Sequence, residues 1–237
     1  MAPPPVLSRF SVVLLDMNGT VMFGGDRFSS EQDFAATYRA LGGRRLEPDV
    51  VQETIATCYA TMGAIYEDPA RCDTFPAVSE TLRELSAGRN LPAAELELLE
   101  RVIATHELGR IPDPYALAIQ RLAARHRLGL VANVLSRKGP WLAEFTRAGV
   151  LHHFVTTVFS SDGSSIKPSR TLFDQAVTAL AAPRSEVVFV GDSLRCDIGG
   201  AAAAGLATVW IDRNGHGRQA RDPEPSFVVR DLLDLVT

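Results

Sequence analysis

The sequence has few cysteines, and their spacing excludes a disulfide framework or a thiolate metal site. Cys58, Cys72 and Cys196 are the only cysteines in 237 residues, and no two of them are in a Cys-x-x-Cys pair. An odd number of widely spaced cysteines is typical of a protein whose thiols stay reduced. We therefore expect a cytoplasmic protein.

Excess positive charge and long apolar runs are also missing. The chain has 24 Lys and Arg against 28 Asp and Glu, and its net charge is −4. This balance argues against a basic nucleic-acid-binding face. No apolar stretch approaches the about 20 residues that cross a bilayer, and the first ten residues lack the apolar core of a signal peptide. We expect no nucleic-acid partner and no membrane segment.

Short apolar runs rich in β-branched residues are present instead. Runs of this length suit strands that are covered on both faces, as in a parallel sheet. From Leu128 onward, helix-like segments separate them, so the pattern predicts an α/β fold with a doubly wound, Rossmann-like, mainly parallel sheet. The predicted strands are Ser11–Leu15, Leu128–Ala132, Phe154–Phe159, Glu186–Val190, Ala207–Ile211 and Ser226–Val229.

The segment between the first two predicted strands contains only helical patterns. We therefore predict a Rossmann-like core of residues 1–21 and 122–237, interrupted by a helical domain of residues 22–121. Ligands of parallel sheets bind at the carboxyl ends of the strands, so this insert is placed to cover a site there and exclude water. Its predicted helices are Glu31–Leu41, Pro48–Tyr66, Val78–Leu85 and Ala93–Glu107, and a helix over 116–126 returns the chain to the core.

Polar residues follow four of the predicted strands. They are Asp16 and Asn18 after the first strand, Asn133 after the second, Lys167 after the third, and Asp192 and Asp197 after the fourth. In a parallel sheet these residues converge on one edge. Three carboxylates at close range repel one another unless a cation lies between them, and oxygen ligands suit Mg²⁺. A lysine beside them can hold a phosphate oxygen.

Each motif also has a structural explanation when it is considered alone. Asp16-Met-Asn-Gly-Thr20 is compatible with a simple turn after a strand. Gly191-Asp192-Ser193 is compatible with a helix N-cap. The occurrence of polar groups at four successive strand ends favours a shared site, in which Asp16 can attack phosphorus directly.

In order and spacing, these motifs resemble those of the haloacid dehalogenase (HAD) superfamily of hydrolases, and the helical insert resembles its C1-type cap. The resemblance extends from about Val12 to Ile211. It implies that Asp16 is the nucleophile and that Lys167 steadies the phosphate. It implies a Mg²⁺ site formed by Asp16, the Asn18 carbonyl and Asp192, with Asp197 as an outer ligand or lysine partner. Backbone amides near Met17 and Asn133 would bind phosphate oxygens.

Two residues depart from the pattern of the family phosphatases. Asn18 stands where those enzymes have an aspartate that acts as general acid and base, help that is worth about 10²–10⁴-fold in rate. Ala132 stands where they have a Ser or Thr that donates to the phosphate. We expect intact Mg²⁺ binding with weakened or altered turnover, for which Ser136 is a possible compensating group.

Three functions follow from this reading. The leading hypothesis is a Mg²⁺-dependent phosphohydrolase that acts on a small phosphomonoester through an aspartyl-phosphate. The second is a non-catalytic homologue that binds a phosphorylated ligand. The third is a haloacid dehalogenase, whose aspartate attacks carbon without a metal, although such enzymes usually lack the Gly191-Asp192 pattern. The sequence does not specify the substrate, the cap residues that contact it, or the oligomeric state.

Overall fold

A computed structural model describes residues 6–86 and 90–236 of the chain. Six strands form one parallel sheet in the order β3-β2-β1-β4-β5-β6. This arrangement confirms the predicted doubly wound, Rossmann-like α/β fold. The strands are β1 (Val12–Leu15), β2 (Arg127–Ala132), β3 (Phe154–Phe159), β4 (Val187–Gly191), β5 (Ala207–Ile211) and β6 (Phe227–Val229).

Helices cover both faces of this sheet, which explains why its central strands β1 and β4 are apolar and buried. Val13 and Leu15 of β1 pack in one hydrophobic cluster with helices α5 and α6. Val12 and Leu14 face the opposite way and pack with α7 and α8. Successive side chains of a strand point to opposite faces, so all four residues are buried. These helices are α5 (Asp113–Ala123), α6 (Gly139–Arg147), α7 (Arg170–Leu180) and α8 (Gly200–Ala203).

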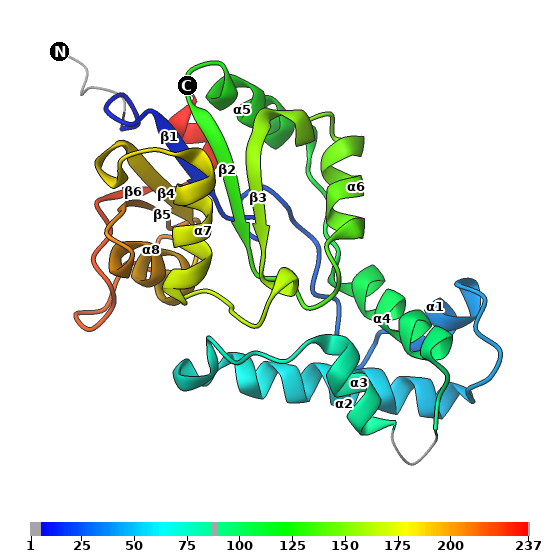
Figure 1. The fold of residues 1–237 in the computed structure, drawn as a ribbon. Coiled ribbons are helices and arrows are strands. Elements are labelled where there is room, and N and C mark those ends of the chain that lie inside the picture. The colour runs from blue at the N-terminus through cyan, green and yellow to red at the C-terminus, as the bar shows by residue number, and fades with distance from the viewer. Residues whose placement is uncertain (1–5, 87–89, 237) are drawn as a thin grey trace.

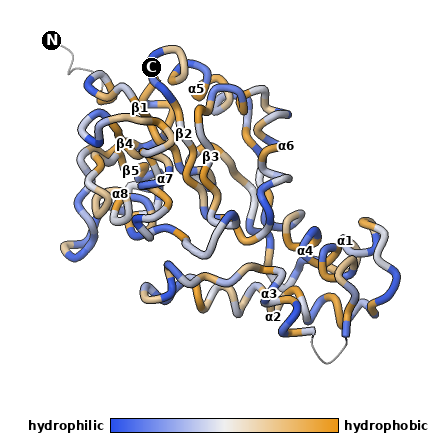
Figure 2. Tube along the Cα trace, viewed as in Figure 1, coloured by the Kyte–Doolittle hydropathy of each residue, from blue (hydrophilic) through white to orange (hydrophobic). Residues whose placement is uncertain are grey.

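The chain between β1 and β2 forms a separate helical group at one end of the sheet (Figure 1). It contains α1 (Phe34–Ala40), α2 (Pro48–Tyr66), α3 (Val78–Leu85) and α4 (Ala93–Glu107). These helices bury a hydrophobic cluster of their own, to which Ile55, Leu82 and Val102 belong. Figure 2 shows apolar residues inside this group as well as along the strands. Helix α5 instead packs against the sheet through Ile119 and Leu122.

The helix-like segment that follows β4 is only partly α-helical. Residues Leu194–Gly199 form a π-helix, η6, and only Gly200–Ala203 are α-helical. The Ser193 hydroxyl accepts a hydrogen bond from the Cys196 N–H at 3.1 Å, and the Asp197 carboxylate accepts the Ser193 N–H at 2.9 Å. These side-chain contacts compete with the regular helical pattern. π-Helical turns are frequent at functional sites.

Within the described ranges, no helix combines the length and the apolarity needed to cross a membrane.

The contribution of β1 to the stability of the core can be tested by truncating one of its buried side chains. We expect Leu14→Ala to lower the free energy of unfolding by about 2–5 kcal/mol, because Leu14 is fully buried and truncation leaves a cavity. Leu117→Ala is the matched control: this side chain is 47% exposed, so the change should stay within about 0.5 kcal/mol. Urea denaturation measures the free energy of unfolding of both variants. Equal losses in the two variants would contradict the placement of Leu14 in the core.

Candidate active site

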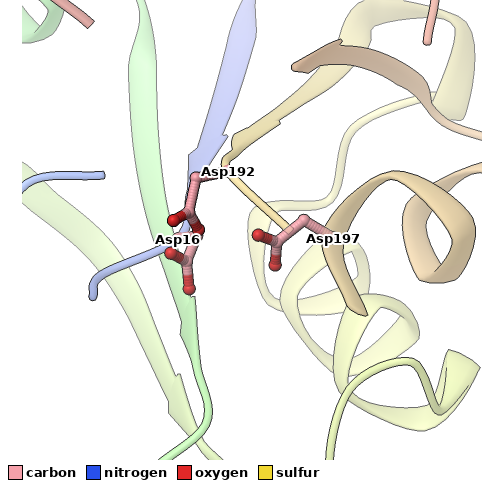
Figure 3. Close-up of side chains that lie close together, drawn as sticks. All are labelled: Asp16, Asp192 and Asp197. Carbon is pink, nitrogen blue, oxygen red and sulfur yellow. The ribbon is translucent and has the colours of Figure 1, made fainter. Parts of the chain in front are cut away.

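Three carboxylates meet at the carboxyl edge of the sheet (Figure 3). Asp16 follows β1, Asp192 follows β4, and Asp197 lies in η6. One oxygen from each carboxylate lies within 4.8 Å of the others. Among the described residues, these three form the one group of metal-ligand type. Strands β1 and β4 are hydrogen-bonded neighbours, so the positions of the first two carboxylates follow directly from the order of the strands.

A buried lysine holds two of these carboxylates together. Lys167 is 2% exposed, and its ammonium group donates to Asp16 Oδ1 and, at 2.8 Å, to Asp197 Oδ1. The other oxygen of Asp197 accepts the Ser193 N–H, so both of its oxygens are already engaged. The second oxygen of Asp16 accepts the Thr20 hydroxyl at 3.1 Å. Lys167 thus bridges Asp16 and Asp197, and both oxygens of each of these two carboxylates accept a hydrogen bond.

The electrostatics of this cluster favour a bound cation. Burial and the negative charge of Asp197, against the opposing charge of Lys167, together raise the pKa of Asp16 to about 7. Burial and Asp197 raise the pKa of Asp192 to about 6 in the same way. Burial lowers the pKa of Lys167, but the negative charges of Asp16 and Asp197 have the larger effect and raise this pKa above its ordinary value. A divalent cation would stabilise the ionised carboxylates that burial disfavours.

Asn133 positions the lysine through its side chain. Its Oδ1 accepts the Lys167 N–H at 2.8 Å, and its Nδ2 donates to the Lys167 carbonyl at 3.2 Å. The same amide donates to the Tyr66 hydroxyl at 3.4 Å. The side chain of Asn133 therefore fixes the backbone that carries the lysine, and only its backbone N–H is left for the expected phosphate contact.

The turn after Asp16 requires a glycine. The Met17 carbonyl accepts the N–H groups of Thr20, Val21 and Met22 within 3.2 Å, which closes the chain tightly behind the carboxylate. Gly19 has a φ of 76°, and a Cβ at this position would lie 2.1 Å from Asp192 Oδ2. Arg213 donates to the Gly19 carbonyl at 3.1 Å. The turn therefore lies directly against the Asp192 carboxylate, with no side chain at Gly19 to separate them.

A cavity of about 520 Å³ opens between this edge and the helical group. Asp16, Asn18, Asn133, Lys167, Asp192 and Asp197 all line it, as the sequence led us to expect of one site. The side chains of Met17 and Ala132 are instead buried in the hydrophobic cluster of the sheet, so only their backbone groups are candidates for ligand contact. The Ser136 hydroxyl is buried without a hydrogen-bond partner among the described residues, and Ser136 is not among the residues that line the cavity.

The sequence did not identify the cavity residues that come from the helical group and its flanks. Asp26 follows the turn, Tyr59 and Tyr66 come from α2, and Glu107 ends α4. At the end of β3, Ser160 also lines the cavity, where its hydroxyl bonds to the Val134 backbone. The sequence predicted the helix Pro48–Tyr66, but it did not indicate which of its residues line the cavity.

The helical group is attached to the loop that carries Lys167. The Asp73 carboxylate accepts hydrogen bonds from the hydroxyls of Ser169 and, at 3.0 Å, Ser165. Beside it, the Phe75 N–H donates to the Ser164 carbonyl and the Ile166 N–H to the Cys72 carbonyl, both at 2.8 Å. These contacts join the segment between α2 and α3 to the core on one side of the cavity.

The fold and the site together define a class: a doubly wound α/β protein with a carboxylate–lysine cluster at the sheet edge beneath a helical insert. Residues 166–235 match the family model described as HAD-hydrolase-like. In this region of its sequence and in its fold, the chain is similar to HAD-like hydrolases. This confirms the resemblance inferred from the four motifs.

Curated relatives of this chain include phosphatases. The phosphoserine phosphatase of Thermus thermophilus is 35% identical over 118 residues, which cover 48% of this chain and 46% of that one. The glyceraldehyde 3-phosphate phosphatase of Methanopyrus kandleri is 33% identical over 148 residues, 57% of this chain and 62% of that one. The chain thus spans about half the length of the curated relatives that it matches.

Solved structures share the fold over nearly the whole chain. A HAD phosphatase from Thermococcus onnurineus has a TM-score of 0.63 at 23% identity and covers 95% of this chain and 96% of that one. A 2-haloacid dehalogenase from Pseudomonas syringae has a TM-score of 0.65 at 20% identity with the same coverage. The HAD-hydrolase YfnB of Bacillus subtilis, solved with magnesium, has a TM-score of 0.59 at 18% identity and covers 96% and 97%. Phosphatases and dehalogenases therefore share this fold, which does not distinguish between them.

The Asp73 contacts give a prediction about how firmly the helical group is attached. We expect Asp73→Ala to speed amide exchange of Phe75 and Ile166 about fivefold, because it removes about 1 kcal/mol of net hydrogen bonding. Asp68→Ala is the matched control, since the Asp68 carboxylate accepts the Ala70 N–H of its own segment at 3.0 Å. Hydrogen exchange measures both variants, and an unchanged rate in Asp73→Ala would show that these contacts do not hold the segment.

The same contacts should depend on pH in a defined direction. The hydrogen bonds from Ser169 and Ser165 lower the pKa of Asp73 below its ordinary value of 3.8. A carboxylate with a lowered pKa stabilises the folded state fully above the unfolded value, and this contribution is lost as the pH falls through the folded value. The difference between wild type and Asp73→Ala should therefore disappear only below about pH 4.

Proposed function

We propose that this protein is a phosphohydrolase that acts on a small phosphomonoester, with Asp16 as nucleophile. The observation that carries the proposal is the convergence of Asp16, Asp192 and Asp197 with the buried Lys167 at the floor of the cavity. Phosphoserine and glyceraldehyde 3-phosphate phosphatases among the curated relatives support the same reaction class.

We propose Mg²⁺ as the cofactor, held by Asp16, Asp192 and the backbone carbonyl of Asn18. The donor set supports this choice, since it consists of oxygen atoms only and its carboxylates lie within 4.8 Å of one another. Asp197 contributes through Lys167, to which it is hydrogen-bonded. When bound, Mg²⁺ would neutralise phosphate charge and orient the phosphorus for in-line attack.

In the proposed reaction, a carboxylate oxygen of Asp16 bonds to phosphorus while the bond from phosphorus to the alcohol oxygen breaks. The alcohol oxygen leaves with the bonding electron pair and takes a proton from water. A second water molecule then attacks the aspartyl-phosphate, which releases phosphate and regenerates the Asp16 carboxylate. Lys167 offsets the charge of Asp16, and the Thr20 hydroxyl fixes the orientation of the carboxylate.

Asn18 distinguishes this site from a site with a full acid–base pair. An amide can donate a hydrogen bond to the leaving oxygen, but it cannot supply the proton, so we propose slow or altered turnover. A non-catalytic phosphate-binding role is the alternative that Asn18 and Ala132 favour. A dehalogenase would need no cation, so the acidic cluster around Asp192 gives it less support.

We further propose that the segment after Val21 is a cap over the site, within the predicted bounds of residues 22–121. The separate hydrophobic cluster of α1–α4 supports an independent unit. Helix α5 lies inside these bounds but packs on the sheet, which supports an end of the cap before Asp113. A cap in this position would exclude water from the phosphorylated intermediate.

The proposed partner is a small phosphorylated molecule, and the proposed location is the cytoplasm. The cavity of about 520 Å³ has the size of a small-molecule site. Cys58, Cys72 and Cys196 are all free thiols, which supports a reducing compartment.

The nucleophile can be tested by phosphate release from a panel of monoesters. We expect activity in wild type with Mg²⁺, loss on adding a chelator, and a fall of about 10³-fold or more in Asp16→Asn. Asp49→Asn is the control, because Asp49 is an exposed residue in the first turn of α2. Wild-type activity no higher than that of Asp16→Asn across the panel would refute the proposal. Halide release from 2-haloacids in the presence of chelator would support the dehalogenase instead.

The role of Asn18 can be tested by restoring the acid. We expect Asn18→Asp to raise kcat by about 10²-fold or more, because it introduces a proton donor beside Asp16. Asn214→Asp makes the same change at an exposed loop position and should leave kcat unaltered. If Asn18→Asp does not raise kcat, then Asn18 does not limit turnover, and the non-catalytic role gains support.

A further inference from the structure

The charge of the cavity lining bears on the organic part of the substrate. Among the described residues that line it, only Lys167 has a cationic side chain. The lining includes six carboxylate residues: Asp16, Asp26, Glu67, Glu107, Asp192 and Asp197. Lys167 already pairs with two of them. A substrate that carries a second anionic group would therefore find no unpaired cationic side chain among these lining residues.

Two arginines that adjoin lining residues in the sequence, Arg27 and Arg195, are engaged elsewhere. Arg27, which follows Asp26, donates to the Leu108 carbonyl at 3.0 Å and to the carbonyls of Gly24 and Thr105. Arg195, in η6, donates to the Tyr66 carbonyl at 3.1 Å and pairs with Glu67 at 3.4 Å. Arginine is the side chain best suited to bind a second phosphate or a carboxylate. Neither of these two arginines is among the residues that line the cavity.

The end of the cavity formed by the flank of α4 is acidic and aromatic. Asp26 has a φ of 53°, and its N–H donates to the Glu107 carbonyl at 3.1 Å. Tyr59 lies against the Phe28 ring with a centroid distance of 4.0 Å. The charges of Asp26 and Glu107 add to the effect of burial in raising the pKa of Tyr59, which places these three groups close together.

Glu107 joins this acidic end to the loop after β2. Its side chain accepts the N–H of Leu135 at 2.6 Å and that of Ser136 at 3.1 Å. Burial raises the pKa of Glu107 to about 8, although these two hydrogen bonds lower it. Glu107 therefore offers a ligand either a neutral carboxylic acid or a negative charge. Of Asp26 and Glu107, Asp26 is the exposed residue, so its carboxylate can contact a ligand.

We propose that the substrate is a phosphomonoester whose organic part carries no anionic group, and that Asp26 helps to select it. An uncharged or amine-bearing organic part fits beside Asp26 and Tyr59, with apolar contact to Met62, Phe75 and Leu135 on the remaining wall. A carboxylate or a second phosphate would face Asp26 without a partner. This inference rests on the proposed phosphohydrolase function and specifies its substrate class.

Three esters of matched size test the proposal: 2-aminoethyl, 2-hydroxyethyl and 2-carboxyethyl phosphate. We expect kcat/KM for the amino and hydroxy esters to exceed that for the carboxy ester by about tenfold or more, from charge interactions in a partly buried site. A carboxy ester that is hydrolysed as well as the hydroxy ester, or better, would overturn the proposal.

Asp26→Asn tests the assigned residue. Asparagine adopts the left-handed conformation of this position readily, so the variant keeps the backbone geometry. It should raise kcat/KM for the carboxy ester about tenfold relative to the hydroxy ester. Glu31→Gln is the matched control, since Glu31 is exposed and is not among the residues that line the cavity. An unchanged ratio in Asp26→Asn would remove Asp26 from the selection of substrate.

Binding measurements distinguish a failure of the charge selection from a failure of the proposed phosphohydrolase function. Calorimetry of the three esters with Asp16→Asn and Mg²⁺ reports their order of affinity without turnover. If wild type hydrolyses none of them but the carboxy ester binds at least tenfold more weakly than the hydroxy ester, the function fails and the charge selection stands. Binding of the carboxy ester as tightly as the others, or no binding of any ester, overturns the selection.

Discussion

The buried contact of Lys167 with Asp16 and Asp197 is the interaction on which the rest of the site depends. All three side chains are at least nine-tenths buried, so each charge needs its partners to offset the loss of water. The lysine lets two carboxylates approach each other, and it leaves Asp16 fixed at the end of the central strand. The side-chain amide of Asn133 holds the lysine backbone from the next strand end. One ion network thus joins the ends of β1, β2 and β4 with the loop after β3.

The helical group is built onto this network rather than onto the sheet alone. Asp73 contacts the hydroxyls of Ser165 and Ser169 on either side of Lys167, and Glu107 accepts two N–H groups from the loop after β2. Arg195 reaches from η6 to the end of α2. Each loop that carries a site residue therefore also contacts the helices.

Much of the fold could be predicted because its signals are local. The apolar runs of the strands reflect burial on two faces, and the helices α2 and α4 have the bounds that their periodicity and flanking prolines indicate. The convergence of Asp16, Lys167, Asp192 and Asp197 follows from strand order, since the carboxyl ends of parallel strands share one edge. The π-helix η6 could not be predicted, because it depends on hydrogen bonds of Ser193 and Asp197 that compete with a regular helix.

The sequence by itself determined the class of fold, the position of the helical insert and the residues at the strand ends. These follow from periodicity and from the direction of parallel strands. Three features were decided only by the tertiary structure. The two oxygens of Asp197 accept hydrogen bonds from Lys167 and Ser193, and the side chain of Asn133 is hydrogen-bonded to the backbone of Lys167. Asp26 and Tyr59 line the cavity. The physical reason is that a side chain's partners are set by packing between segments distant in sequence, which no local pattern records.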